Sequence, residues 1–355
     1  MSFWRRTWVL ILAIILLAGS VFGLLLSVVP HSEAAKDPHL KVELYVIPEV
    51  LTGAYKIYGG QNSNVWVART LITNTGEVPV KDLNISYKIN NYSDWTNAEN
   101  YPEIVPGETV RDYCWPDFQA EDMQKINNKT AAEVTMQYSY SGMNQPKQDM
   151  GQFYFLGKND FVWTFKNPDD IVDWNFQDSY DNASLLPSFI TTNDPTIQEA
   201  AKALTAGLYT ASDADTQEAI SRIWAGLQGY GMQYVSEPQT FWTSSNGQYI
   251  QFPVETLNNR GGNCVDLSLL LASLAEAVDI KTYLCLSEGH CQVAFEMPES
   301  GDIYPLEETE VGAVGVTAAM AVSDATDWIN QQIDQGTFFS VDVRAQWQNG
   351  VVPSW

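Results

Sequence analysis

The chain has 355 residues, 45% of them hydrophobic, and a formal net charge of −24. This length is enough for two ordinary domains with sizeable cores. The excess of carboxylates argues against a nucleic-acid partner, because no basic stripe is available to neutralise phosphates. An acidic surface favours solubility and repels anionic polymers.

The N-terminus carries an uncharged, mostly apolar run over residues 8–29. A helix needs about 20 apolar residues to cross the hydrocarbon core of a bilayer. Arg5 and Arg6 precede the run and acidic residues follow it, which predicts a cytoplasmic N-terminus and domains outside the cell. Residues 1–35 are therefore expected to be a membrane anchor and spacer of a single-pass protein. A signal peptide cleaved near residues 32–34 is the alternative, and it would export the same domains.

Four Asn-X-Ser/Thr sequons fit an exported glycoprotein. They begin at Asn84, Asn91, Asn128 and Asn182. The pattern is short and frequent by chance, so it adds little weight to the prediction of export.

Residues 36–157 are predicted to form an all-β, immunoglobulin-like sandwich. Apolar and polar residues alternate in several short runs that are separated by turn residues such as Asn74-Thr75-Gly76. The clearest runs are Val42–Val46, Leu83–Ile89 and Val134–Tyr140. Short strands with regular turn signals are typical of such a sandwich. The region has only Cys114 and no histidine after His39, so we expect a spacer or binding module.

The second domain, residues 158–355, opens with helical patterns and then concentrates its chemistry around Cys264. Asn263 is a good N-cap, and Asp266 stands where a capping box has its acid, so a helix is expected to begin at Cys264. A helix N-terminus favours anions, which predicts a lowered pKa for the Cys264 thiol. Gly261 and Gly262 are expected to allow a sharp turn and to leave room for a substrate.

A hairpin is predicted next, with strands at residues 282–286 and 290–296. His290 would lie on its polar face. After Pro38 the chain has only His39 and His290, so an imidazole partner for Cys264 must be His290. A third group should orient that ring, and Glu307 is the candidate with Glu308 as the alternative.

The order of Cys264, His290 and an acid before Thr309 resembles the transglutaminase-like superfamily, and residues 253–266 resemble its prokaryotic, often archaeal, membrane-anchored members. The resemblance implies a papain-like α+β fold with the cysteine at a helix start, against a sheet that carries the histidine and the acid. The family usually has aspartate where this chain has Asn263 and Glu307.

The resemblance also implies an oxyanion or substrate-orienting role for Gln251, and Asn263 is assigned to the same part of the site. The expected fold class is thus α+β, with an N-terminal transmembrane helix, a β-sandwich and a papain-like transglutaminase core. The expected function is an extracellular, membrane-anchored cysteine acyl-transfer enzyme that attacks amide bonds of a protein or peptide substrate through a thioester. Hydrolysis is favoured over cross-linking because water is abundant at an exposed site.

A non-catalytic binding or structural protein of the cell envelope, with a degenerate domain of this kind, is the alternative function. No cofactor is expected, and no metal site, because histidines are few and no Cys-X-X-Cys spacing is present. Cys285 and Cys291 are expected to form either a disulfide or two buried free thiols.

Overall fold

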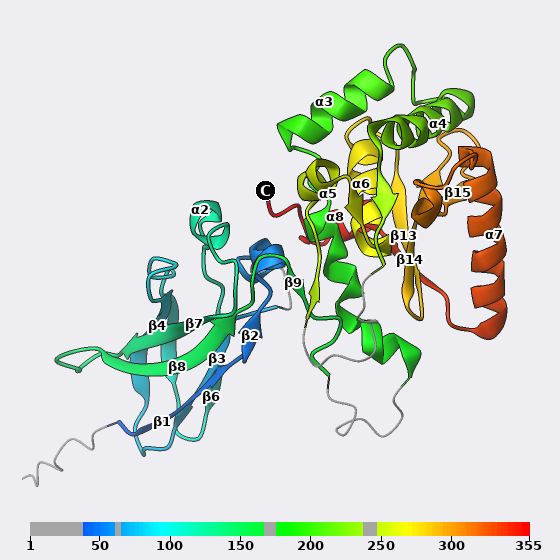
Figure 1. Ribbon diagram of the computed structural model, residues 1–355. Helices are drawn as coiled ribbons and strands as arrows, with labels where there is room; N and C mark the ends of the chain where they lie inside the picture. Colours follow the sequence, from blue (N-terminus) through cyan, green and yellow to red (C-terminus); the bar gives the residue numbers. More distant parts are fainter. Residues whose placement is uncertain (1–37, 61–64, 167–174, 237–246) are drawn as a thin grey trace, which may run out of the picture.

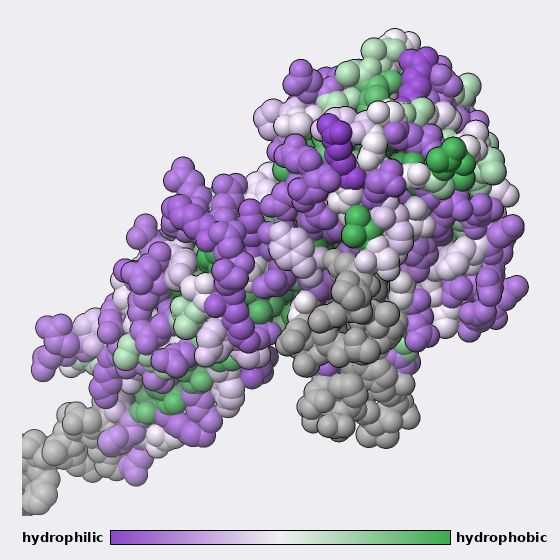
Figure 2. Space-filling model, viewed as in Figure 1, coloured by the Kyte–Doolittle hydropathy of each residue, from purple (hydrophilic) through white to green (hydrophobic). Residues whose placement is uncertain are grey.

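A computed structural model describes residues 38–60, 65–166, 175–236 and 247–355. It has a β-rich N-terminal part and a mixed α and β C-terminal part, which lie side by side (Figure 1). The buried hydrophobic residues divide into two clusters, one centred in each part, and Val351 near the C-terminus joins the N-terminal cluster. Figure 2 shows hydrophilic residues over most of the visible face of both parts, as the acidic composition leads one to expect.

The N-terminal part is built from two sheets. The first has the order β1 (Leu40–Val46), β3 (Ala68–Asn74), β6 (Thr109–Cys114). The second has the order β2 (Glu49–Val50), β8 (Lys147–Phe155), β7 (Thr130–Ser139), β4 (Val80–Ile89), β5 (Glu99–Ile104). The predicted alternation is confirmed on β4, where Leu83, Ile85, Tyr87 and Ile89 are at most 1% exposed. Period-two burial fits strands that have one face on a core. Two short helices, η1 (Thr52–Tyr58) and α2 (Ala120–Met123), complete this part.

The C-terminal part surrounds a four-stranded antiparallel sheet. Its order is β15 (Ile303–Leu306), β14 (His290–Glu296), β13 (Thr282–Ser287), β16 (Phe339–Asp342). Two-residue strands pair separately, β9 (Asp160–Phe161) with β11 (Gln248–Tyr249) and β10 (Gln233–Tyr234) with β12 (Gly261–Gly262). The helices are η3 (Phe176–Phe189), α3 (Pro195–Leu204), α4 (Asp213–Tyr230), α5 (Pro253–Asn259), α6 (Cys264–Glu276), η4 (Glu308–Glu310), α7 (Ala318–Gln335) and α8 (Val343–Gln348).

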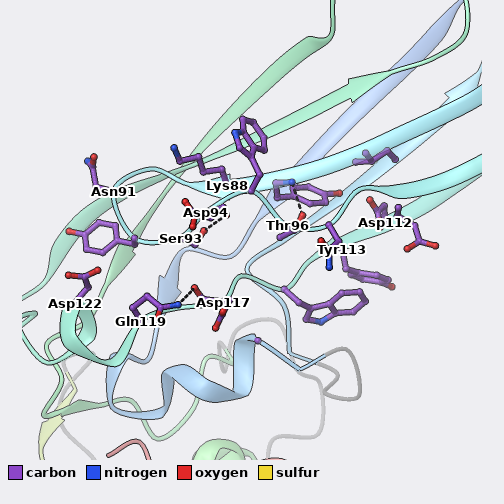
Figure 3. A pocket seen from close by; sticks show the side chains of 18 residues that line it. Lys88, Asn91, Ser93, Asp94, Thr96, Asp112, Tyr113, Asp117, Gln119 and Asp122 are labelled. Carbon is purple, nitrogen blue, oxygen red and sulfur yellow. Dashed lines mark hydrogen bonds between the residues drawn. The ribbon is translucent and has the colours of Figure 1, made fainter.

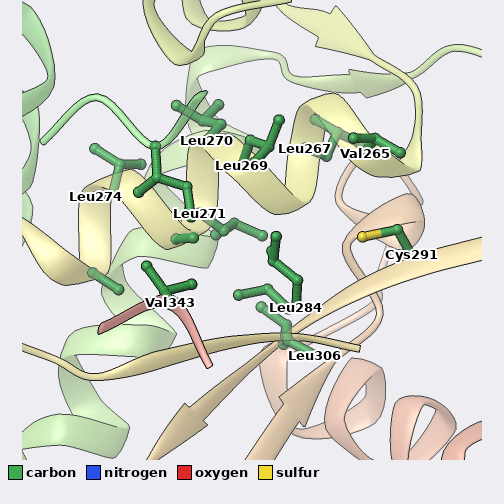
Figure 4. Close-up of a cluster of buried hydrophobic side chains, with 14 of the residues drawn as sticks. Val265, Leu267, Leu269, Leu270, Leu271, Leu274, Leu284, Cys291, Leu306 and Val343 are labelled. Atoms are coloured by element: carbon green, nitrogen blue, oxygen red, sulfur yellow. The ribbon is translucent and has the colours of Figure 1, made fainter. Parts of the chain in front are cut away.

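Helix α6 is the centre of this part. Every one of its 13 residues is buried, so the helix is covered on all sides. In Figure 4 its leucines lie above strand residues that include Leu284 and Leu306. A helix that is mostly apolar on every face is stable in water only inside a core. This burial fixes Cys264, the first residue of α6, against the sheet.

The structure corrects the prediction of a transmembrane helix. Across the part of the chain that is described, no helix is both long and apolar enough to cross a bilayer. Helix α6 is apolar but has only 13 residues, against about 20 required. Helices α4 and α7 have 18 residues each, but both carry aspartates. The fold class with a transmembrane helix and the single-pass membrane localisation were therefore wrong, and the observed fold has mixed α and β content. The apolar run at residues 8–29 lies outside the described residues.

The C-terminal residues return to the sandwich. Trp355 stacks on Tyr55 with ring centroids 5.7 Å apart, and it also contacts Phe252, 5.1 Å away in the C-terminal part. Lys56 Nζ donates to the carbonyl of Pro353 over 2.7 Å. The two parts are thus joined by aromatic packing and hydrogen bonds as well as by the chain itself.

One of the four sequons is inaccessible. Asn182 is 8% exposed, and its Nδ2 donates to the carbonyl of Val162 over 2.7 Å. A glycan attached to this nitrogen would break the buried hydrogen bond and would not fit in the space around it. Asn182 is therefore not a glycosylation site in this fold.

Candidate active site

Cys264 is held at the start of α6 by the predicted capping box. The side chain of Asn263 accepts from Asp266 N over 3.0 Å, and the Asp266 carboxylate accepts from Asn263 N over 3.1 Å. This reciprocal pair satisfies two backbone donors that a helix start leaves open. The prediction that a helix begins at Cys264 is confirmed.

The sharp turn before Cys264 is made one residue earlier than predicted. Arg260, the C-cap of α5, has a φ of +53° in the left-handed region, whereas Gly261 and Gly262 are extended in β12. Gly262 has a different reason to be glycine. A Cβ there would lie 2.5 Å from the Cβ of Asp266, inside the space that the capping carboxylate occupies.

Asp266 also anchors Gln251. Its carboxylate accepts from the backbone N of Gln251 over 2.8 Å and from Gln251 Nε2 over 3.0 Å. Gln251 Nε2 donates a second time, to the carbonyl of Gly261 over 3.2 Å. An amide nitrogen has two hydrogens to donate. Both are engaged, so in this structure Gln251 braces the cap of α6 and has no donor to spare for an oxyanion.

Asn263 keeps a free donor. Its Nδ2 is buried and has no hydrogen-bond partner, although the Oδ1 of the same side chain is used in the cap. A buried polar group without a partner is costly and is commonly found at a functional site. This donor belongs to the residue that directly precedes Cys264.

His290 is the first residue of β14, and its ring is paired with Glu307. The distance from His290 Nε2 to Glu307 Oε2 is 3.0 Å, and both side chains are largely buried. Glu307 follows β15, which pairs with β14 in a register that places Leu306 opposite Val293. The structure therefore brings together two of the predicted site residues. The Nδ1 atom is left as the ring nitrogen that can accept a proton.

Three further residues support this pair, and of these only Thr309 was part of the sequence motif, without a role assigned to it. Gln292 Nε2 and Thr309 Oγ1 both donate to the Glu307 carboxylate. Burial raises the pKa of Glu307, but the hydrogen bonds and the charge of His290, with Thr309 and Gln292, outweigh it and lower the pKa overall. Trp328 of α7 meets the His290 ring edge-on, with centroids 4.9 Å apart and planes at 83°. The carboxylate is thus kept ionised and the imidazole is held from two sides.

Glu308 lies near the same histidine but makes no hydrogen bond to its ring. It is fully buried, and neither carboxylate oxygen makes a hydrogen bond of good geometry. Burial and the charge of Glu307 raise its pKa well above the usual range, although Ser268 of α6 lies close enough to lower it somewhat. Burial beneath α6 thus favours the neutral form of Glu308, while Glu307 is the acid that hydrogen-bonds to His290.

The thiol of Cys264 is more deeply buried than the sequence suggested. The residue is 6% exposed, and its thiol lies against the backbone of Cys291, next to His290 in the chain. Burial, together with the nearby Glu308, raises the pKa of Cys264 to about 12, although the backbone of Cys291 and Val265 lowers it. The predicted fall in pKa was therefore wrong, because loss of solvation outweighs the helix terminus. Of the hydrogen bonds formed by the described residues, none joins this thiol to the His290 ring.

Cys285 and Cys291 are both buried free thiols, so of the two expected alternatives the structure has the free thiols and not the disulfide. The turn has two residues, Glu288 and Gly289, so Ser287 pairs with His290 and Cys285 pairs with Gln292. Opposite residues of an antiparallel pair share a face, and successive residues alternate. Cys285 and Cys291 therefore point to opposite faces of the sheet.

A metal ion could be held by the groups at the histidine. Ligand atoms of His290, Glu307 and Glu308 all lie within 4.8 Å of one another. Glu307 already accepts from three side chains, which is the arrangement of an oriented histidine. The expectation that no metal is used stays a prediction.

Comparisons with known proteins give only distant likeness. No protein-family model matches the chain, and no curated protein matches its sequence. Among solved structures, the chain is similar to a putative cysteine protease from Cytophaga hutchinsonii, with 12% identity and a TM-score of 0.26 over 77% of this chain and 80% of the other. It is also similar to a putative protease from Parabacteroides distasonis, with 10% identity and a TM-score of 0.28 over 67% of this chain and 45% of the other. Likeness at these TM-scores carries no inference about this chain, so its chemistry has to be judged from the arrangement of its own side chains.

Proposed function

We propose that the protein is a cysteine acyl-transfer enzyme of the transglutaminase-like kind that attacks amide bonds of a peptide or protein, with Cys264 as nucleophile, His290 as base and Glu307 as orienting acid. The observation that carries the proposal is the pairing of His290 Nε2 with the buried, ionised Glu307, on a strand whose next residue contacts the Cys264 thiol. A histidine oriented through one nitrogen presents the other to a nucleophile.

The reaction begins with the neutral thiol. With its pKa raised to about 12, Cys264 holds its proton at pH 7, so it needs a base at the moment of attack. His290 accepts the proton at Nδ1 while the sulfur bonds to the amide carbonyl carbon. His290 then gives that proton to the departing amine as the C–N bond breaks, which leaves a thioester on Cys264. The hydrogen bonds on Nε2 and the Glu307 charge stabilise the imidazolium that forms in between.

The carbonyl oxygen becomes negative in the tetrahedral intermediate and needs donors. The N–H of Cys264 lies in the first turn of α6, where N–H groups have no partner within the helix. Asn263 Nδ2 is a second, unpartnered donor one residue away. Such preorganised donors often contribute the largest part of the stabilisation in acyl transfer.

Hydrolysis completes the proposed cycle. Water loses a proton to His290 and attacks the thioester, and Cys264 recovers its proton as the acid product leaves. No feature of the described residues selects a second amine in place of water, so we favour a peptidase or amidase over a cross-linking enzyme. The deep burial of the thiol and its missing bond to His290 favour one alternative, a non-catalytic binding protein.

The test is a screen of the full chain against peptide amides, with products identified by mass with and without an added primary amine. Cleavage should require Cys264 and survive Cys285→Ala, the matched buried cysteine. Glu307→Gln should abolish most of the activity. Glu308→Gln should retain most of it, because Glu308 makes no hydrogen bond to His290 and the amide has a similar shape. Equal losses in the two glutamine variants would overturn the assignment of Glu307, and absence of any cleavage would favour the binding protein.

A further inference from the structure

A second concave site lies in the sandwich, away from Cys264. A cavity of about 780 Å³ is formed by the connection between β4 and β5, by β6 and by the segment that leads into α2 (Figure 3). This volume lies within the range of sites that hold small molecules or side chains. None of the proposed catalytic residues lines it.

The walls of this cavity are strongly acidic. The carboxylates on them belong to Asp94, Glu99, Asp112, Asp117 and Asp122, and Lys88 is the one basic residue among the lining side chains. Asp122 is paired with Lys125, which does not line the cavity, over 3.0 Å. The other four carboxylates have no ion pair within the described ranges of the chain. Such a cavity attracts cations.

Aromatic rings lie between the carboxylates. They belong to Tyr92, Trp95, Tyr113 and Trp115, besides the buried Tyr87. Tyr113 and Trp115 are in contact, with centroids 5.2 Å apart, and Trp95 is 41% exposed. The face of a tyrosine or tryptophan ring attracts an ammonium or a guanidinium group. The rings therefore favour the same sign of ligand as the carboxylates do.

Two buried polar atoms on the walls point to the ligand's chemistry. Asp112 is 6% exposed, and its Oδ2 makes no hydrogen bond of good geometry. Burial raises the pKa of this carboxyl to about 6, and Glu99 on β5 also raises it, whereas the backbone of Tyr113 and the nearby hydroxyls of Tyr87 and Tyr101 lower it. The buried Nε1 of Trp115 has no partner. The carboxylate can therefore accept from a further donor, and the indole N–H needs an acceptor.

A metal ion does not match these walls. Calcium takes six to eight oxygens at about 2.3–2.6 Å, which must converge on one point. Figure 3 shows Asp94, Asp112, Asp117 and Asp122 distributed around the cavity. In the described part of the chain, the one group with converging ligand atoms is the group at His290. The separated carboxylates suit a larger cation that spans the space between them.

We propose that this cavity binds a basic residue of a peptide. Its ammonium or guanidinium group would lie near Asp112 and between the aromatic rings, and a neighbouring backbone carbonyl would accept from Trp115 Nε1. Lysine and arginine residues carry both groups, the donor cation on the side chain and the acceptor on the main chain. A neutral sugar would leave the buried Asp112 charge without compensation.

The test measures binding to the full chain by calorimetry, with the peptide Ac-Gly-Arg-Gly-NH2 and its citrulline counterpart, which has the same shape but no charge. The arginine peptide should bind at least about ten-fold more tightly than the citrulline peptide, since a hydrogen bond to a charged group is lost in the latter. Its affinity should fall with added salt, as expected for partly exposed charges. Spermidine, a cation without a carbonyl, should bind more weakly than the arginine peptide.

Variants distinguish binding in this cavity from non-specific attraction to the acidic surface. Asp112→Asn should weaken arginine-peptide binding about ten-fold. The exposed pair Asp94→Asn/Asp117→Asn should weaken it several-fold, and this variant carries the test if Asp112→Asn does not fold. Glu103→Gln removes one charge from β5 outside the cavity and should leave binding unchanged. The indole N–H signal of Trp115 in an NMR spectrum should shift on binding.

Several results would overturn the proposal. One is equal binding of the arginine and citrulline peptides, or tighter binding of a neutral oligosaccharide such as maltotriose. Another is equal weakening by Glu103→Gln and by the double variant. If spermidine bound as tightly as the peptide, the cavity would be a site for free amines and not for a peptide. If calorimetry detected no heat at millimolar peptide, the cavity would not be a peptide-binding site.

Discussion

The alkylation rate of Cys264 depends on whether His290 acts as its base. Burial places the pKa of Cys264 at about 12, against an ordinary 9.0. Three units correspond to about 4 kcal/mol and to a thiolate population about 1000-fold smaller at neutral pH. Without a base, Cys264 would react with iodoacetamide about 1000-fold more slowly than an exposed thiol, since the thiolate is the nucleophile.

The chain contains its own control. Cys285 is 2% exposed, and burial raises its pKa to about 12 as well, but its paired residue is Gln292 and not a histidine. We expect Cys264 to alkylate at least about 100-fold faster than Cys285 at pH 7.5, because a positioned base contributes about 10²–10⁴-fold. Peptide mass spectrometry after timed quenching gives both rates from one sample.

The His290→Ala variant completes the experiment. It should bring Cys264 down to the rate of Cys285, and both rates should then rise about ten-fold per pH unit, as the thiolate population does. In the unchanged protein the slope for Cys264 should be shallower. Equal rates and equal slopes for the two cysteines in the unchanged protein would refute the role of His290.

Three further outcomes follow from the contacts described above. Glu307→Gln should lower kcat by about 10²–10⁴-fold with little change in KM, because the orienting carboxylate acts on the transition state, and steady-state kinetics on a cleaved peptide amide would check this. Asp266→Asn should lower the free energy of unfolding by about 2–3 kcal/mol in urea denaturation, since its carboxylate caps α6 and holds Gln251; an unchanged midpoint would contradict this. Asp112 has a pKa raised from 3.8 to about 6 in the folded state, so its ionisation should reduce stability by about 2–2.5 kcal/mol as pH rises from 4 to 7. Asp112→Asn should remove that part of the pH dependence, and a persistent loss of the same size would assign it to other groups.

Local patterns were enough to place the elements that carry the site. The capping box at Asn263 and Asp266 lies within four successive residues, and it predicted the start of α6 correctly. Alternating apolar residues predicted the cores of β4 and β7, and the second strand of the hairpin was predicted at its observed bounds, His290–Glu296. These signals are contiguous because helix and strand periods repeat over two to four residues.

The choice between Glu307 and Glu308 could not be made from the sequence. Both residues lie just beyond β15, Glu307 as the N-cap of η4 and Glu308 as its first residue, so the answer depends on how the chain turns where η4 begins. That turn lets Glu307 hydrogen-bond to His290 and Gln292 and leaves Glu308 buried beneath α6. Strand alternation, in contrast, separates Cys285 from Cys291, because the turn between their strands has two residues.

The sequence alone determined the local features: the cap that places Cys264 at a helix start, the one histidine available to it, and a β-rich region that precedes one with both helices and strands. Only the tertiary structure decided the environment of those groups. Packing of α6 inside the core raises the pKa of Cys264, and α7 brings Trp328 to His290 from nearly forty residues away in the chain. The cavity in the sandwich likewise gathers residues of β4, β6 and the segment before α2. The solvation and the contacts of a side chain depend on segments that are distant in the sequence. The local periodicity of apolar residues does not show which of these segments pack together.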